Sequence, residues 1–96
     1  MLRFDDLQLF VRAADLGSLS AAAKQLGLTQ QAISASISKL EKEIDLRLFD
    51  RAPGGITKPT AYGRALVRHA RSQIAAIARA EQELHAIHDA TGGTIT

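Results

Sequence analysis

The segment from residue 18 to residue 45 holds the feature that most restricts the fold, because it contains two helical patterns with almost no chain between them. Gly27 is suited to end the first helix, since glycine readily adopts positive φ. Thr29 is suited to cap the next helix, since its hydroxyl can accept a backbone hydrogen bond. Only Leu28 lies between the two. Two short helices joined by so tight a turn favour a helix-turn-helix, and a generic helical hairpin is the alternative.

Apolar residues recur at helical spacing around this turn and predict three helices. The first runs from about Asp5 to Asp15 and ends at Gly17, and the second follows at once with Ser18 as its cap. The Ala22–Ala23 pair is small enough to let two helices approach closely where they cross. The third helix, residues 29–45, is expected to bury one narrow arc made of Ile33, Ile37, Leu40 and Ile44.

The opposite face of the third helix is small and polar. It holds Gln31, Ser34, Ala35, Ser38 and Lys42, with Lys39 at its border. A helix that only faces solvent would usually carry Glu and Lys here, because both are better helix formers than serine. Small hydroxyls and amides instead suit the major groove of B-DNA, whose base edges Gln and Ser can read. A polar face without any partner is the alternative.

Composition limits the other possibilities. A chain of 96 residues with 46% hydrophobic and 23% charged residues suffices for one small folded domain and is too short for two cores. The absence of cysteine excludes disulfides, thiolate zinc sites and cysteine nucleophiles. The longest apolar stretches are too short to span a bilayer, and the N-terminus lacks the layout of a signal peptide.

Positive charge is concentrated in one part of the chain. The formal net charge is only +2. Between residues 47 and 71, however, a single acid, Asp50, stands against six basic residues: Arg47, Arg51, Lys58, Arg64, Arg68 and Arg71. A basic patch of this kind can bind a polyanion, and a solvated basic surface explains it equally well.

The segment LRLFDRAPGGITKP predicts a two-stranded hairpin after the third helix. Leu46, Leu48 and Ile56 alternate with polar residues on either side of Pro53-Gly54. Proline followed by glycine suits the two central positions of a type II turn, because the second position needs positive φ.

A long last helix is predicted from its cap, Thr60, to about His88. It would extend about 43 Å at about 1.5 Å per residue, which is more than so small a domain can cover. Its apolar stripe is the predicted dimer interface and comprises Leu66, Ala70, Ile74, Ile77, Leu84 and Ile87. The alternative, that the helix folds back over its own domain, can hold only for about its first two turns.

Catalytic and metal-binding functions find little support in the sequence. Glu81, His85 and His88 share a helix face, but no complete set of ligands stands out. Ser, His and Asp are all present, yet no spacing suggests a nucleophile turn. We therefore expect no enzymatic activity, no metal and no cofactor.

Residues 10–51, FVRAADLGSLSAAAKQLGLTQQAISASISKLEKEIDLRLFDR, resemble the N-terminal winged helix-turn-helix of the LysR-type transcriptional regulators. The resemblance is carried by Gly17-Ser18, Ala22–Ala23 before Leu26, Gln30, Ser34, Ile37, Leu40-Glu41 and Leu48-Phe49-Asp50-Arg51. The later run Pro59-Thr60-Ala61-Tyr62-Gly63 is similar to the Thr-x-x-Gly segment that begins the linker helix of that family. The match covers essentially the whole chain.

This resemblance implies a mainly α fold, with a winged helix-turn-helix of three helices and a two-stranded β wing in residues 1–59. A linker helix used for dimerisation follows in residues 60–89. Residues 90–96 would be a hinge or the start of an absent effector-binding domain, through which alone a small-molecule effector would act. The chain would then be an excised or naturally truncated fragment, with excision favoured.

The function that the resemblance implies is sequence-specific binding of double-stranded DNA by a bacterial, cytoplasmic transcription regulator. The third helix would enter the major groove, and the wing, residues 46–58, would reach the flanking backbone or the minor groove. A homodimer, with the linker helices antiparallel, would recognise an interrupted palindrome in an operator or promoter. A tetramer stays open for the full-length protein.

Individual roles follow as hypotheses. Base contacts are expected from Gln30, Gln31, Ser34, Ala35 and Ser38. Contacts with phosphates are expected from Ser18, Ser20, Thr29 and Lys39, and from Arg51 and Lys58 on the wing. Each basic residue also has an alternative without DNA. Arg51 would form an ion pair with Asp50 or a nearby acid. Lys39 and Lys42 would belong to a solvated pattern with Glu41 and Glu43.

Some positions depart from the pattern of the family. Gln31 stands where proline is common, and Ala35 stands where arginine or lysine is frequent, so any base preference of the family is not transferred. The segment from wing to linker is one residue longer than usual, with Pro59 in an ordinarily aliphatic slot, which leaves the register of the wing open. The rival function is a winged-helix adaptor that dimerises without specific DNA binding. The rival family is the molybdate-responsive regulators, which have a similar N-terminal domain.

Overall fold

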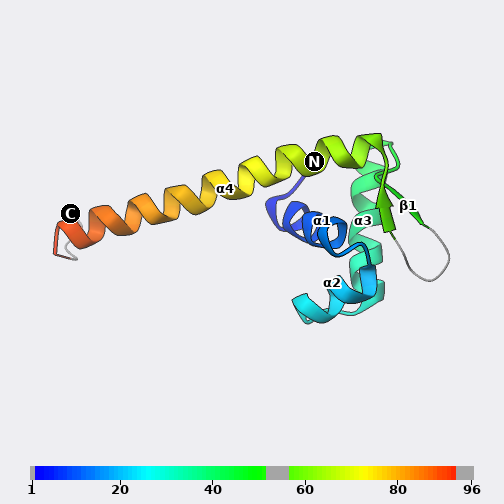
Figure 1. The fold of residues 1–96 in the computed structure, drawn as a ribbon, viewed down its shortest axis with the longest axis horizontal. Coiled ribbons are helices and arrows are strands. Elements are labelled where there is room, and N and C mark those ends of the chain that lie inside the picture. The colour runs from blue at the N-terminus through cyan, green and yellow to red at the C-terminus, as the bar shows by residue number, and fades with distance from the viewer. Residues whose placement is uncertain (1, 52–56, 93–96) are drawn as a thin grey trace.

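The computed structural model describes residues 2–51 and 57–92. Its elements are α1 (Phe4–Leu16), α2 (Leu19–Leu26), α3 (Gln30–Ile44), β1 (Phe49–Arg51), β2 (Thr57–Pro59) and α4 (Ala61–Ala90). The molecule measures 55 × 25 × 18 Å, because α4 projects far beyond the unit that the other elements form (Figure 1). A mainly helical fold with a small antiparallel sheet and a long last helix confirms the predicted fold class.

Side-chain caps and left-handed glycines set the ends of the first three helices. The hydroxyls of Ser18 and Thr29 each accept a hydrogen bond from the backbone N–H three residues further on, at 3.2 and 3.1 Å. Gly17 and Gly27 follow α1 and α2 with φ angles of 65° and 68°, in the region that glycine adopts without steric cost. The predicted caps and stops are therefore confirmed, and so is the tight turn between α2 and α3.

One core joins these helices to the hairpin. Its largest fully buried side chains are Phe10, Phe49, Ile33, Ile37, Leu40 and Leu48. The rings of Phe10 and Phe49 have centroids 4.9 Å apart and tilt by 39°, so the start of the wing is packed directly on α1. The Ala22–Ala23 pair is buried in the same core, as predicted. The predicted arc of α3 is confirmed, with Ile44 half-buried at its rim.

The hairpin is antiparallel, with Phe49 opposite Pro59, Asp50 opposite Lys58 and Arg51 opposite Thr57. This pairing answers the question of register that the long wing-to-linker segment raised. The N–H of Thr57 donates to the carbonyl of Gly17 at 3.0 Å, which attaches β2 to the turn between α1 and α2.

The predicted alternation of apolar residues in the hairpin is only partly right. Leu48 is buried, but it precedes β1, and Leu46 lies before the strand with 40% of its surface exposed. Leu46 follows directly on Asp45, which has a positive φ of 56° and ends α3. Ile56 and the expected turn at Pro53-Gly54 lie outside the described residues.

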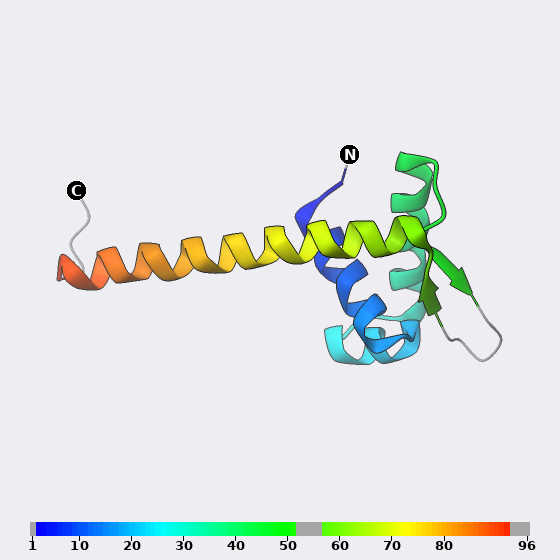
Figure 2. The same cartoon turned by 45° about the horizontal axis from the view of Figure 1, so that its top comes forward.

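Helix α4 starts on the core and then leaves it. Leu66 and Val67 pack against the core, and Ala70 is 1% exposed. Further along, Ile77, Leu84 and Ile87 are 46%, 64% and 55% exposed. Figure 2 shows the same division from another side: the first turns of α4 cross over the helical unit, and the rest extends away from it. Below, the helical unit is α1 to α3, and the outer half of α4 is residues 75–90.

Candidate nucleic-acid interface

Helix α3 has one buried face and one face that its own fold leaves uncovered. Gln31, Ala35, Lys39 and Lys42 are exposed, and Ser34 and Ser38 are half-buried. None of the exposed large hydrophobic side chains found among the described residues belongs to α3. The uncovered face is therefore polar, as the spacing predicts, and Ser34, Ala35 and Ser38 contribute short side chains to it.

The starts of α2 and α3 lie together and are joined by a side-chain contact. The Ser20 hydroxyl donates to Oε1 of Gln30 at 2.8 Å, and both residues are exposed. The Ser18 and Thr29 hydroxyls cap their own helices, as described above. These residues, predicted to reach phosphates or bases, thus lie where two helix N-termini present backbone N–H groups that lack helical partners.

The wing places one side of the hairpin toward the core and the other toward solvent. Phe49 and Thr57 are buried, whereas Asp50 and Lys58 are exposed and occupy paired positions on the two strands. Lys58 is therefore available for the predicted contact with a flanking phosphate. Arg51 belongs to β1, but its side chain lies outside the described part, so its proposed alternatives, DNA contact or ion pair, are not distinguished.

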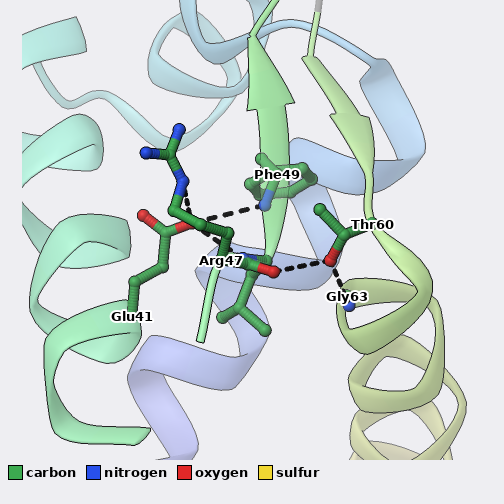
Figure 3. A network of polar contacts seen from close by, with 6 residues as sticks. Glu41, Arg47, Phe49, Thr60 and Gly63 are labelled. Carbon is green, nitrogen blue, oxygen red and sulfur yellow. Dashed lines mark hydrogen bonds and ion pairs between the residues drawn. The ribbon is translucent and has the colours of Figure 1, made fainter. Parts of the chain in front are cut away.

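The base of the wing is held by a polar network that the sequence did not reveal (Figure 3). The carboxylate of Glu41 accepts hydrogen bonds from the N–H groups of Leu48 and Phe49 at 2.8 and 3.3 Å. The guanidinium of Arg47 lies 3.7 Å from the same carboxylate oxygen, and the Glu41 side chain is only 14% exposed. Glu41 therefore joins α3 to β1, which corrects the alternative that made it part of a solvated Lys–Glu pattern.

The same network continues into α4. The Thr60 hydroxyl donates to the Arg47 carbonyl at 2.6 Å and accepts from the Gly63 N–H at 3.1 Å, and the Thr60 N–H donates to the Leu48 carbonyl at 2.9 Å. A Cβ built on Gly63 would lie 2.1 Å from that Leu48 carbonyl oxygen. The Thr-x-x-Gly spacing is thus explained, because only glycine lets α4 pass so close to the wing.

The predicted basic patch is partly used within the chain. Arg47 faces Glu41, Arg64 donates to the Pro59 carbonyl at 3.2 Å, and Arg71 forms an ion pair with Asp15 on α1. These contacts tie α4 and the wing to the helical unit. Because Arg47 and Arg71 each face an acid, the count of basic residues overstates the net positive charge offered to a polyanion.

The described residues give no other candidate site of comparable definition. Within residues 2–51 and 57–92, no cluster of three or more His, Asp and Glu side chains could hold a metal ion. No helix in this part of the chain combines the length and the apolar character needed to cross a membrane. The predicted face of Glu81, His85 and His88 lies on the exposed outer half of α4.

The helix-turn-helix, the hairpin and the long helix together define the chain as a winged helix-turn-helix domain with a projecting helix. The pattern of bacterial regulatory helix-turn-helix proteins of the lysR family matches residues 4–64. The chain therefore belongs to the LysR family.

Curated relatives agree with this assignment. The chain is 34% identical over 95 residues to the nitrogen assimilation regulatory protein nac of Escherichia coli K12, which covers 99% of this chain and 31% of that protein. It is 37% identical over 95 residues to the HTH-type transcriptional regulator CfxR of Cupriavidus necator, covering 99% of this chain and 30% of that protein. The chain thus spans about a third of the length of these relatives.

Solved structures share the fold. The chain from a CbnR_DBD–DNA complex superposes with a TM-score of 0.81 at 28% identity, covering 90% of this chain and 98% of that one. The chain from a complex of BenM_DBD with catB site 1 DNA superposes with a TM-score of 0.84 at 23% identity, covering 90% of this chain and 94% of that one. At that lower identity, the second likeness supports the fold alone.

Proposed function

We propose that the chain binds double-stranded DNA sequence-specifically, with α3 in the major groove and the wing on the flanking backbone or minor groove. The observation that carries the proposal is the polar face of α3, which the fold leaves uncovered beside an exposed wing. A major groove about 12 Å wide admits a helix whose outward side chains are short. The likeness to the CbnR_DBD chain, solved with DNA, supports the same arrangement.

The proposed contacts follow from the positions of the side chains. Gln30, Gln31, Ser34, Ala35 and Ser38 would face base edges, since they lie on the uncovered face or at the start of α3. Ser18, Thr29, Lys39, Lys58 and Arg51 would anchor the phosphates. Ala35 offers only a methyl group, which suits the methyl of thymine rather than a hydrogen-bonding edge.

Two copies would associate through the outer half of α4. Ile77, Leu84 and Ile87 are exposed there, whereas Leu66 and Ala70 of the predicted stripe already face the core of their own chain. We propose that the two helices run antiparallel, as the resemblance to the LysR family implies. A two-fold dimer would then present two α3 helices to two half-sites.

The adaptor alternative is disfavoured by the same surface. A protein-binding face would be expected to carry large apolar side chains, and those exposed on the described residues lie outside α3. The LysR family is one of regulatory helix-turn-helix proteins, and the proposed function requires no catalysis. We also propose that the whole protein is a cytoplasmic regulator, in which a small-molecule effector would bind outside this chain.

Selection from random duplexes tests the proposal. The chain is immobilised, incubated with random double-stranded DNA at about physiological salt, where non-specific binding weakens, and the retained DNA is sequenced. We expect an interrupted palindrome. An unenriched pool would contradict sequence-specific binding.

Two variants then distinguish a residue that reads bases from one that contacts phosphates. Gln31→Ala should change which sites are preferred, whereas Lys58→Ala should weaken matched and scrambled duplexes alike and lower the salt dependence of binding. Equal losses on both duplexes for Gln31→Ala would remove Gln31 from base reading.

A further inference from the structure

A contact between two exposed side chains at the start of α2 and α3 bears on which base the chain prefers. Ser20 and Gln30 are ten residues apart, and the serine hydroxyl donates to Oε1 of the glutamine at 2.8 Å. Neither residue is needed for the core, since both are exposed. The contact therefore orients a surface amide rather than stabilising the interior.

The direction of this hydrogen bond determines what Gln30 offers to a ligand. A glutamine amide has an oxygen that accepts and an NH₂ group that donates, both bonded to the same carbon. With Oε1 engaged by Ser20, the NH₂ group is the end of the amide that would meet a ligand. While this hydrogen bond is formed, the single hydrogen of the Ser20 hydroxyl is engaged, and the backbone N–H groups at the start of α2 would serve the predicted phosphate contact.

The backbone around Gln30 also presents hydrogen-bond donors. Gln30 and Gln31 are in the first turn of α3, where backbone N–H groups have no helical partner, and Thr29 already occupies the N–H of Ala32. The start of α3 thus combines outward N–H donors with the donor end of the Gln30 amide. Such a surface complements a ligand edge that only accepts.

We propose that Ser20 is a positioning residue that makes Gln30 a donor to guanine. Guanine presents two acceptors, N7 and O6, in the major groove, whereas bidentate reading of adenine needs both the oxygen and the nitrogen of an amide. The contact with Ser20 opposes the rotation that would bring Oε1 to adenine N6. This inference rests on the proposed sequence-specific DNA binding, and it adds a residue of α2 to the determinants of base preference.

The first test measures base preference in the selected site. Each position of the half-site is replaced in turn by all four base pairs, and Gln30→Ala identifies the position where its preference disappears. There, the chain should lose roughly tenfold in affinity when guanine is changed to adenine, the size expected for one lost base contact. Ser20→Ala should reduce this ratio to about threefold or less at that position only.

Controls separate positioning from folding. Ser20→Thr keeps a hydroxyl and should restore the guanine preference, and the midpoint of thermal unfolding should be the same for all three proteins. An unchanged guanine-to-adenine ratio in Ser20→Ala would overturn the role of Ser20. A wild-type chain that enriches no site would instead contradict the proposed function itself, so the two failures are distinguishable.

A second variant reverses the chemistry of Gln30. Gln30→Glu keeps an oxygen for the Ser20 hydroxyl but has no donor, so the preference at this position should move from guanine to cytosine, whose N4 group donates. Gln31→Glu is the matched control, because it adds the same charge next door without a contact to Ser20. A uniform loss over all four base pairs in Gln30→Glu would place Gln30 at a phosphate and overturn the inference.

Discussion

The helical unit and the outer half of α4 both carry isoleucine and leucine at helical spacing, but these side chains are buried in the unit and exposed on the outer half. In the unit, Ile33, Ile37 and Leu40 are fully buried, and the helix ends are closed by hydroxyl caps and left-handed residues. On the outer half, Ile77, Leu84 and Ile87 repeat at comparable spacing, yet about half or more of each side chain is exposed. Periodicity alone therefore predicts that a face is apolar, and the chain around it decides whether the face is covered.

The difference also divides the function. The helical unit fixes the geometry of α3 and the wing, because every element that borders them is tied to the same core. Most of the outer half extends beyond this core and offers exposed apolar side chains that a second copy could cover. Reading of DNA and pairing of subunits are thus proposed to reside in separable parts of one chain.

Substitutions of matched size give the sharpest contrast between the two parts. Ile37→Ala removes buried volume from the core and should lower the free energy of unfolding by about 2–5 kcal/mol. Leu84→Ala should change the unfolding of the monomer by no more than about 0.5 kcal/mol, since the side chain is exposed there. Denaturant titration in dilute solution measures both.

On dimer formation, the order of the effects of these two substitutions should be reversed. Leu84→Ala should raise the dissociation constant of the dimer about tenfold or more, because each copy loses buried apolar surface. Sedimentation over a range of concentrations measures this constant. A chain that is monomeric at tens of micromolar before any substitution would contradict the proposed dimer interface.

The fold of the helical unit was largely predictable because its signals are local. Gly17, Gly27, Ser18 and Thr29 mark helix ends through the conformation and hydrogen bonds of a few neighbouring residues, and each was correctly assigned. Leu46 was assigned wrongly to the hairpin pattern. Its alternation with Leu48 is typical of a strand, but α3 ends at Asp45 in the left-handed conformation, and β1 begins only at Phe49, so Leu46 lies before the paired strand.

A substitution at the junction of the wing with α4 tests how closely the two elements must pack. Gly63→Ala brings a methyl group within 2.1 Å of the Leu48 carbonyl oxygen, so helix or wing must move, at a cost of about 3 kcal/mol. Gly17→Ala is the matched control. It meets no atom within 4 Å and pays only for its left-handed φ, about 1–2 kcal/mol.

Thermal unfolding of the two variants compares these costs directly. Gly63→Ala should also weaken binding to a selected duplex, because the wing is attached at Leu48 and Phe49. If Gly63→Ala lowers the unfolding midpoint no more than Gly17→Ala does, the junction adjusts easily and does not position α4.

The interface was less predictable than the fold, since its supporting contacts join residues far apart in the sequence. Glu41 looked like one charge in a solvated pattern, and nothing near it in the sequence shows that its carboxylate receives the N–H groups of Leu48 and Phe49. The contact of Ser20 with Gln30 depends on how α2 crosses α3. For Glu41 the sequence signal was its place in a motif shared with the family, whereas Thr60 was also predicted as the cap of the last helix, which its hydrogen bond from the Gly63 N–H confirms.

Glu41 gives a smaller test of how firmly the wing belongs to the helical unit. Glu41→Gln keeps the shape but removes the charge from two hydrogen bonds to backbone N–H groups, which should cost about 1–2 kcal/mol. Hydrogen exchange at the N–H groups of Leu48 and Phe49 should accelerate, and Glu81→Gln on the outer half should leave both unchanged. Unchanged exchange in Glu41→Gln would indicate that the core alone holds β1.

The ion pair of Arg71 with Asp15 marks where α4 leaves the unit, and it should have the smallest effect. Its side chains are 56% and 30% exposed, so water and salt weaken the attraction, and a surface pair contributes only about 0–1 kcal/mol. Arg71→Gln should therefore barely change the unfolding midpoint, and the small difference should disappear at about 1 M salt. A double-mutant cycle with Asp15→Asn isolates the pair, with Arg79→Gln on the outer half as the control. A coupling well above 1 kcal/mol would mean that this contact fixes the direction of α4, and that the boundary between the covered and uncovered parts is set by charge rather than by the end of the core.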